Sequence, residues 1–222
     1  YVDRFRTSLM FDIIVIGAGP TGLVSSLTFA TAGYSVAVVD PVDRGANAIS
    51  KCGDGLKDHR TTAHLSPTVE YLKGLGAWNE IRRNACALEK LVIIEDTYQN
   101  RIRKRRTKTV FDPGELGNQN FGFNVPIRDN LEGLAKLIKL NSNITQYFGV
   151  GLTDIVQDNE VVSGILTDGT IINAKLLIGA DGGGSQVRTS LGIGVKKKYT
   201  GQNALSFHVA HEAPHFNTST EI

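Results

Sequence analysis

A glycine pattern close to the amino terminus has the residue types and the spacing that bind phosphate groups. It reads Gly17, Ala18, Gly19, Pro20, Thr21 and Gly22. In such a turn Gly17 permits the tight bend, Gly19 lets the backbone approach a pyrophosphate, and Gly22 lets a helix pack against a strand. The N–H groups at the start of that helix would then bind the pyrophosphate. The pattern therefore predicts a dinucleotide-binding turn.

The residues around this turn are typical of a β-α-β unit. Residues 13–16 are a β-branched apolar run that predicts a buried strand, residues 23–32 have a helical composition, and residues 34–39 resemble a second strand. Asp40 ends the second strand, 18 residues after Gly22, where its carboxylate would accept a hydrogen bond from an adenosine 2′-hydroxyl. The same carboxylate would repel the 2′-phosphate of NADP.

A second glycine turn follows a later strand-like run. Residues 175–180 predict the last buried strand of the sheet, and Asp181 and Gly182 open a glycine-rich turn after it. Ser185 and Arg188 follow where a helix should begin. Because one nucleotide needs only one such turn, the second turn predicts a longer cofactor or two cofactors that share a cleft. The first turn alone does not distinguish FAD from NAD.

Together these segments resemble the flavin-dependent aromatic monooxygenases of the para-hydroxybenzoate hydroxylase class, and within it the ubiquinone-biosynthesis hydroxylases. Three segments carry the resemblance: the turn at 17–22 with Asp40, the arginine-bearing segment 58–66 ahead of the Leu-Gly-Ala-Trp sequence at 75–78, and the Gly-Ala-Asp-Gly sequence at 179–182 with Ser185 and Arg188. The segment 124–127, followed by Leu131, is also similar to the family's return to its FAD domain.

The resemblance implies FAD as the cofactor and NAD(P)H as a co-substrate. Arg60 would contact the pyrophosphate of FAD or border its isoalloxazine ring, and Asp181 with Gly182 would bind the ribityl or phosphate region. The implied reaction is reduction of FAD by NAD(P)H, capture of O2 as a flavin hydroperoxide, and hydroxylation of an aromatic or ubiquinone-precursor ring. The substrate would be a small aromatic or prenylated phenol. Because the flavin carries this chemistry, no protein residue is assigned a catalytic role.

Two other functions remain open at the level of sequence. One is a different FAD-dependent oxidoreductase, such as an oxidase or a halogenase-like enzyme, which would share the first turn. The other is a truncated, non-catalytic module that binds FAD or another anion, because the family's later Gly-Asp segment is absent and family members are longer. The chain is therefore expected to be truncated at its carboxyl end.

The predicted fold is α/β, with a Rossmann-like FAD-binding domain and a mostly antiparallel, incomplete substrate lobe. The FAD-binding domain is predicted from residues 10–77 and 128–194, and the lobe from residues 78–127 and 195–222. Runs within the lobe predict an antiparallel sheet, with a further strand-like run near the end; they are 91–94, 101–111, 121–125 and 204–210. Residues 1–9 precede the only methionine, Met10, and are expected to be vector-derived rather than native.

Composition restricts the remaining function classes. The net charge of +2 gives no general attraction to nucleic acid, and no apolar run approaches the roughly 20 residues that span a bilayer. Cys52 and Cys86 are too few for a disulfide framework, so they are expected to be free thiols in a reducing cytosol. The predicted location is cytoplasmic, with a peripheral membrane contact or a biosynthetic complex left open.

Two further patterns have weaker interpretations. Six basic residues lie between positions 101 and 108, where the charged edge strand of a hairpin is the first expectation. Attraction of an anionic cofactor, partner or membrane surface is the alternative, and nucleic acid is not expected because interleaved aromatic residues are missing. His211, Glu212 and His215 match a zinc-protease pattern, but Pro214 opposes the helix that this pattern needs, so no metal site is predicted.

Overall fold

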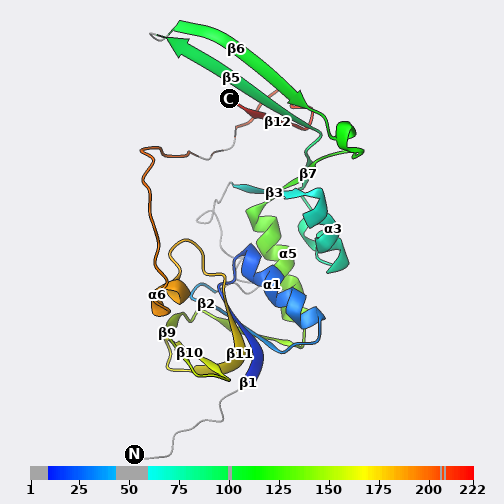
Figure 1. Cartoon of the computed structure of the whole chain (residues 1–222). Helices are drawn as coiled ribbons and strands as arrows, with labels where there is room; N and C mark the ends of the chain where they lie inside the picture. The colour runs from blue at the N-terminus through cyan, green and yellow to red at the C-terminus, as the bar shows by residue number, and fades with distance from the viewer. Residues whose placement is uncertain (1–9, 44–59, 100–101, 206, 208) are drawn as a thin grey trace, which may run out of the picture. The chain divides into compact units, whose positions relative to one another are not determined.

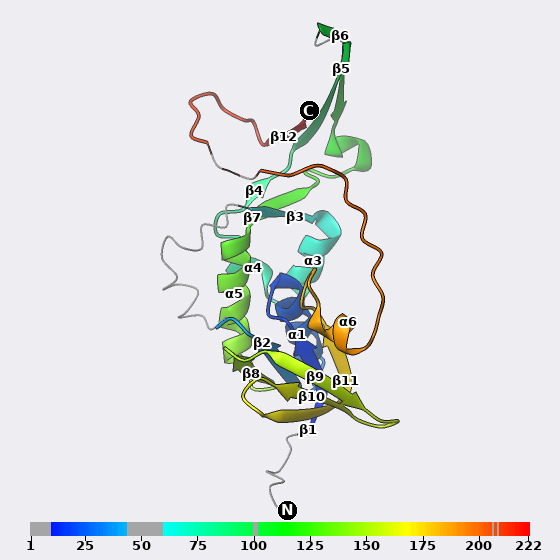
Figure 2. The same cartoon turned by 90° about the vertical axis from the view of Figure 1, so that its left-hand side faces the viewer.

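The computed structural model describes residues 10–43, 60–99, 102–205, 207 and 209–222 (Figures 1 and 2). The predictions for residues 1–9 and for Cys52 lie outside this range. Contacts divide the chain into two units, Tyr1–Lys57 with Asn130–Ala204 and Asp58–Asp129 with Leu205–Ile222. The first unit contains both glycine turns.

The first unit is built on a six-stranded sheet with the order β8-β2-β1-β11-β10-β9. Neighbours from β8 to β11 are parallel, as expected for β-α-β units, and β10 and β9 continue the sheet in antiparallel fashion. The bounds are Met10–Ile16 for β1, Val36–Asp40 for β2, Ile144–Phe148 for β8, Leu152–Gln157 for β9, Val162–Leu166 for β10 and Ile171–Gly179 for β11. The predicted β-α-β unit is therefore confirmed.

Helices cover one face of this sheet. Helix α1 spans Pro20–Thr31 and α5 spans Ile127–Leu140, and both lie on the same side of the sheet in Figures 1 and 2. Their inward side chains are buried, among them Leu23, Leu27, Leu134 and Ile138. A short helix, α6, spans Gln186–Ser190 after the second glycine turn. The apolar spacing predicted for residues 130–140 therefore supplies part of the core.

The other face of the sheet is covered by the sheet's own antiparallel strands. Ile14 of β1 and Val39 of β2 belong to one apolar cluster with Leu166 of β10. Leu152 and Ile155 of β9 pack against this cluster. The parallel strands are thus buried on both faces, which is why their sequences lack an alternating polar side.

Strand β11 differs from the prediction. The sequence predicts a strand at 175–180, but the structure has one longer strand, Ile171–Gly179, parallel to β1 and antiparallel to β10. It is also less buried than predicted. Leu176 is 48% exposed. It pairs with Ile13 of β1, but α1, on that face of the sheet, packs mainly on β1, β2 and β8 and does not cover β11 to the same extent.

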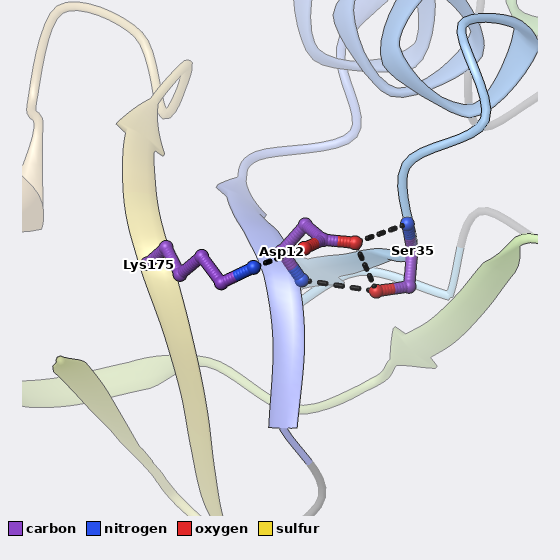
Figure 3. A network of polar contacts seen from close by, with 3 residues as sticks. All are labelled: Asp12, Ser35 and Lys175. Atoms are coloured by element: carbon purple, nitrogen blue, oxygen red, sulfur yellow. Dashed lines mark hydrogen bonds and ion pairs between the residues drawn. The ribbon is translucent and has the colours of Figure 1, made fainter.

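Asp12 connects three segments of the first unit (Figure 3). Its carboxylate accepts hydrogen bonds from the Ser35 N–H at 3.0 Å and the Ser35 hydroxyl at 2.8 Å, and pairs with the Lys175 ammonium at 2.9 Å. The Ser35 N–H, the Lys175 ammonium and the Ser35 hydroxyl together lower the pKa of Asp12 from 3.8 to about 2. The network fixes β1 between β11 and the residue that precedes β2.

The second unit contains two small sheets. One has the antiparallel order β3-β7-β4, and the other has the order β12-β5-β6. The bounds are Thr61–Leu65 for β3, Cys86–Ala87 for β4, Lys90–Gln99 for β5, Ile102–Phe111 for β6, Gly122–Pro126 for β7, Thr218–Glu221 for β12, Ser66–Gly74 for α3, Trp78–Ile81 for α4 and Pro113–Leu116 for the 3-10 helix η2. The predicted pairing of the first two runs of the lobe is confirmed as the β5–β6 hairpin, and β6 lies at an edge of its described sheet. The third predicted run, 121–125, does not join that sheet, because β7 pairs with β3 and β4 instead. No helix in the described part of the chain has both the length and the apolar character that crossing a bilayer requires.

The contact units differ from the predicted lobes in three stretches: residues 60–77 and 128–129 fall in the second unit, and residues 195–204 fall in the first. Residues 60–77 pack with the second unit rather than with the first, because β3 pairs with β7 over its whole length. The strand predicted at 204–210 is not observed, because none of the described residues in this range is in a strand. The side chains of Leu205 and Phe207 are exposed. The strand observed among the last described residues is β12, Thr218–Glu221, which pairs in parallel with β5. The assignment of the two units as FAD domain and substrate lobe stays a prediction.

Candidate functional site

The first glycine turn joins β1 to α1, and its three glycines have different surroundings. Gly17 has φ +103°, and a Cβ there would overlap the backbone of Ala180. A Cβ on Gly22 would overlap the carbonyl oxygen of Gly17. A Cβ on Gly19 would meet no described atom within 4 Å. Packing within the chain thus explains Gly17 and Gly22, whereas no described atom restricts the space beside Gly19.

Helix α1 begins directly at this space. Gly19 is the N-cap in an extended conformation, Pro20 occupies the first helical position and Thr21 is exposed. Within the described residues, no side chain caps this helix start. The first N–H groups of the helix, together with its dipole, therefore favour an anion at this point.

Asp40, at the end of β2, lies against the same turn. The residue is only 6% exposed. One carboxylate oxygen accepts a hydrogen bond from the Ala18 N–H at 2.6 Å, and the other accepts from the Val42 N–H at 2.8 Å. The sequence spacing did not indicate these backbone partners, and the ribose contact of Asp40 stays a prediction.

The second glycine turn is organised by three side chains. The Asp181 carboxylate accepts from the Val187 N–H at 3.0 Å, the Ser185 hydroxyl accepts from the Arg188 N–H at 3.1 Å, and the Arg188 guanidinium donates to the Gly183 carbonyl at 2.6 Å. Burial alone would raise the pKa of Asp181. Hydrogen bonds from the Ser185 hydroxyl and the Val187 amide outweigh that effect and hold the pKa below 3.8. An ionised carboxylate therefore stands at the start of α6.

Strand order brings the two turns and Asp40 to one edge of the sheet. Because β1 lies between β2 and β11 and all three are parallel, their carboxyl ends meet there. The Gly17 N–H donates to the Val39 carbonyl at 2.7 Å, and the Ala180 N–H donates to the Ile16 carbonyl at 2.7 Å. In sheets of this kind ligands bind just outside the carboxyl ends of the strands.

A pocket of about 490 Å³ opens at this edge. It brings together three of the predicted site residues, Gly17, Asp40 and Asp181. It is also lined by residues that sequence reasoning missed, namely Pro41, Val42, Gly151, Leu152, Thr167, Gly184 and Gln186. No sequence motif marks the loops around β9 and β10 as ligand-binding, and strand pairing brings them to this edge. Because two carboxylates line the pocket, it suits hydroxyl groups better than phosphate.

The other predicted residues lie at different places. Gly182 has φ +78° within the second turn, and a Cβ there would meet no described atom within 4 Å. Arg60 belongs to the second unit, where its carbonyl oxygen accepts from the Ile127 N–H at 3.1 Å, and its contact with a cofactor stays a prediction. Cys86 is a free thiol. Residues 211–215 form a loop rather than a helix, as Pro214 predicts.

Comparisons with known proteins agree with this geometry. A sequence model of the family described as FAD binding domain matches residues 10–221. The chain is 27% identical over 201 residues to 3-demethoxyubiquinol 3-hydroxylase of Escherichia coli, covering 90% of this chain and 49% of that protein. It is 26% identical over 212 residues to ubiquinone hydroxylase UbiL of Rhodospirillum rubrum, covering 95% of this chain and 46% of that protein.

Solved structures show the same fold. The crystal structure of p-nitrophenol 4-monooxygenase PnpA from Pseudomonas putida matches with a TM-score of 0.63 at 19% identity, over 83% of this chain and 44% of that one. The chain spans about half the length of the curated relatives it matches. The predicted α/β fold with a Rossmann-like domain is confirmed.

Proposed function

The chain belongs to the family of FAD binding domains, and from this membership we propose that it is the FAD-binding part of a monooxygenase. The proposed reaction is hydroxylation of an aromatic or ubiquinone-precursor ring, with NAD(P)H as the reductant and O2 as the oxidant. One observation carries the proposal: two glycine turns meet at one sheet edge, with open space in front of Gly19 at the start of α1.

The residues at this edge fit FAD. The start of α1 would hold the pyrophosphate, because Gly19 leaves room there and helix N–H groups favour an anion. The pocket with Asp40 and Asp181 would hold sugar or ribityl hydroxyls, because carboxylates accept hydrogen bonds from them. FAD supplies the redox chemistry when it is bound, and these residues bind and orient it.

The ring class is inferred from the relatives. The Escherichia coli protein is named a hydroxylase of 3-demethoxyubiquinol, the Rhodospirillum rubrum protein is named a ubiquinone hydroxylase, and the Pseudomonas putida enzyme is named for p-nitrophenol. We therefore infer a small aromatic or prenylated phenol as the substrate of this chain. A cytoplasmic location, with contact to a membrane surface or a biosynthetic complex, is part of the same proposal.

A visible absorption spectrum of the purified chain, before and after addition of FAD, tests the cofactor assignment. We expect oxidised-flavin absorption to remain with the protein after gel filtration. Gly19→Ala should abolish this retention and leave the fold intact, because its Cβ would occupy the space in front of the helix. Gly194→Ala is the matched control, since a Cβ there also meets no described atom within 4 Å, and it should retain FAD. A folded wild-type chain that takes up no FAD would contradict the proposal.

Product analysis tests the reaction. NAD(P)H oxidation in the presence of a panel of phenols should yield a hydroxylated product. Hydrogen peroxide without a hydroxylated product would instead identify an FAD-dependent oxidase. FAD retention without any NAD(P)H oxidation would favour the non-catalytic binding module.

A further inference from the structure

We propose that the β5–β6 hairpin docks the chain on an anionic membrane surface. Basic side chains of β6 contact the lipid headgroups, and apolar side chains at the end of β6 and in η2 enter the boundary of the acyl chains. The inference rests on the membrane contact within the proposed function and names the surface that makes it. It does not require bound FAD.

The hairpin concentrates the positive charge of the chain. Residues 90–111 contain seven lysine and arginine residues and two acidic residues, Glu95 and Asp96, whereas the net charge of the whole chain is +2. The remainder of the chain is therefore net negative. An anionic surface attracts the hairpin in particular, and this attraction orients the chain as it approaches.

The described basic side chains of β6 are those of Arg105, Arg106 and Lys108, and all three are exposed. Arg106 pairs with Asp96 of β5, with 3.4 Å between the guanidinium Nε and a carboxylate oxygen. Neither Arg105 nor Lys108 forms an ion pair with a described residue. Their charges are therefore available to an anionic partner.

The outer part of the hairpin has no third strand beside it in the described part of the chain. Strand β12 pairs with β5 only at residues 90–93, and beyond Ile93 the strands β5 and β6 continue as a two-stranded ribbon (Figures 1 and 2). A two-stranded hairpin without further packing is only marginally stable in water. Contact with a surface would therefore stabilise this ribbon.

Apolar side chains are exposed next to these charges. Val110 and Phe111 are 49% and 40% exposed at the end of β6, and Leu116 of η2 is 71% exposed. Charges on an edge strand prevent it from pairing with other chains, but this protection does not account for exposed apolar groups beside them. A bilayer interface accommodates both, because Lys and Arg contact anionic headgroups while apolar side chains enter the acyl boundary.

Other anionic partners fit the hairpin less well. Proteins that bind single-stranded nucleic acids use aromatic side chains as stacking platforms, and residues 101–108 contain no aromatic residue. A nucleic acid duplex would use the charges and leave Phe111 and Leu116 without a role. The prenylated phenol proposed as the substrate dissolves in lipid, which favours a membrane over an acidic protein.

Flotation with lipid vesicles tests the surface. One set of vesicles contains phosphatidylcholine alone, and the other contains phosphatidylcholine mixed with anionic phosphatidylserine. We expect the chain to float with the anionic vesicles and not with the neutral ones. This binding should weaken as salt is added, because salt screens exposed charges. Equal binding to the two sets, or binding to neither, would overturn the proposal.

A double substitution tests the charges of β6. Arg105→Gln combined with Lys108→Gln removes both unpaired charges, and each basic residue near an anionic membrane changes binding roughly fivefold, so the loss should be roughly thirtyfold. Lys196→Gln combined with Lys198→Gln is the matched control, because it removes the same charge from another exposed basic run and should bind as the wild type does. Equal losses in the two double variants would contradict a specific role of β6.

A single substitution tests the apolar contact. Leu116→Ala should weaken binding to anionic vesicles roughly tenfold. Leu140→Ala is the control, since Leu140 is exposed to a similar extent on α5, and it should bind as the wild type does. Circular dichroism should show the native fold in both variants. Unchanged vesicle binding by Leu116→Ala, with duplex DNA bound as tightly as the vesicles, would identify a general polyanion surface instead of a membrane surface.

Retention of FAD is measured on the same samples, so that the two proposals can fail separately. A chain that binds anionic vesicles through β6 and retains no FAD would contradict the proposed FAD site and support the membrane surface. A chain that retains FAD and does not float with anionic vesicles would do the reverse.

Discussion

The backbone N–H of Ala180 donates to the carbonyl oxygen of Ile16 at 2.7 Å, which ties the second glycine turn to the strand that leads into the first. Gly17 follows Ile16, and a Cβ on Gly17 would overlap the Ala180 backbone. The two turns are therefore in direct contact. A side chain cannot be added at Gly17 without moving the second turn, so the two turns have to be treated as one structure when variants are designed.

Gly22→Ala should destabilise the fold itself. Its Cβ would overlap the Gly17 carbonyl oxygen, and overpacking of this kind costs about 1–3 kcal/mol of unfolding free energy. Urea unfolding followed by circular dichroism measures the loss. Gly19→Ala is the control, because a Cβ there meets no described atom within 4 Å, and it should change stability by less than about 0.5 kcal/mol. Equal stability of Gly22→Ala and the wild type would contradict the packing role of Gly22.

Asp12→Asn should remove a contribution to stability that depends on pH. The pKa of Asp12 is lowered in the folded chain from 3.8 to about 2. The ionised carboxylate therefore stabilises the fold above about pH 4, and this contribution is lost as the pH falls towards about 2. The variant should be less stable at neutral pH, with a flatter stability profile over that acidic range.

Acid unfolding followed by circular dichroism measures this profile, with Lys175→Met for comparison. Lys175→Met removes only the ion pair, so its effect should be smaller, because the Ser35 N–H contributes most to the lowered pKa. An acid profile of Asp12→Asn identical to that of the wild type would show that the network in Figure 3 does not stabilise the fold.

Ser185→Ala should weaken α6 and raise the pKa of Asp181. The buried Ser185 hydroxyl caps the helix by accepting from the Arg188 N–H, and loss of such a cap costs about 1 kcal/mol. The same hydroxyl lowers the pKa of Asp181, so that pKa should move upward in the variant. An NMR titration of the Asp181 carboxyl measures the change. Ser190→Ala, at the other end of α6, should leave the titration unchanged.

Leu134→Ala should be among the most damaging substitutions in α5. Leu134 is 1% exposed and Leu140, on the same helix, is 74% exposed. Removing a buried leucine side chain costs about 2–5 kcal/mol, whereas exposed positions usually change stability by less than about 0.5 kcal/mol. Leu140→Ala is therefore the control in urea unfolding. Comparable losses in the two variants would mean that α5 is not packed on the sheet as described.

The sequence predicts the β-α-β unit and both turns because their signals are local. Gly17, Gly19 and Gly22 have a spacing that a single turn requires, and the neighbouring strands are continuous apolar runs. Contacts between distant segments carry no such signal. Asp12 and Lys175 are 163 residues apart, and no motif marks either of them. Likewise, β3 joins the second unit only because it pairs with β7, which sequence order alone does not indicate.

The parallel pairing of β12 with β5 joins segments that are made at very different times. Asn217 donates to Glu89 across 128 residues, whereas β5 and β6 follow each other directly in the chain. At cellular elongation rates, on the order of ten seconds therefore pass between the synthesis of the β5–β6 hairpin and the synthesis of β12. The first unit has all of its strands once β11 has left the ribosome. The second unit still lacks β12 at that moment, so the order of synthesis sets when β12 can join its sheet.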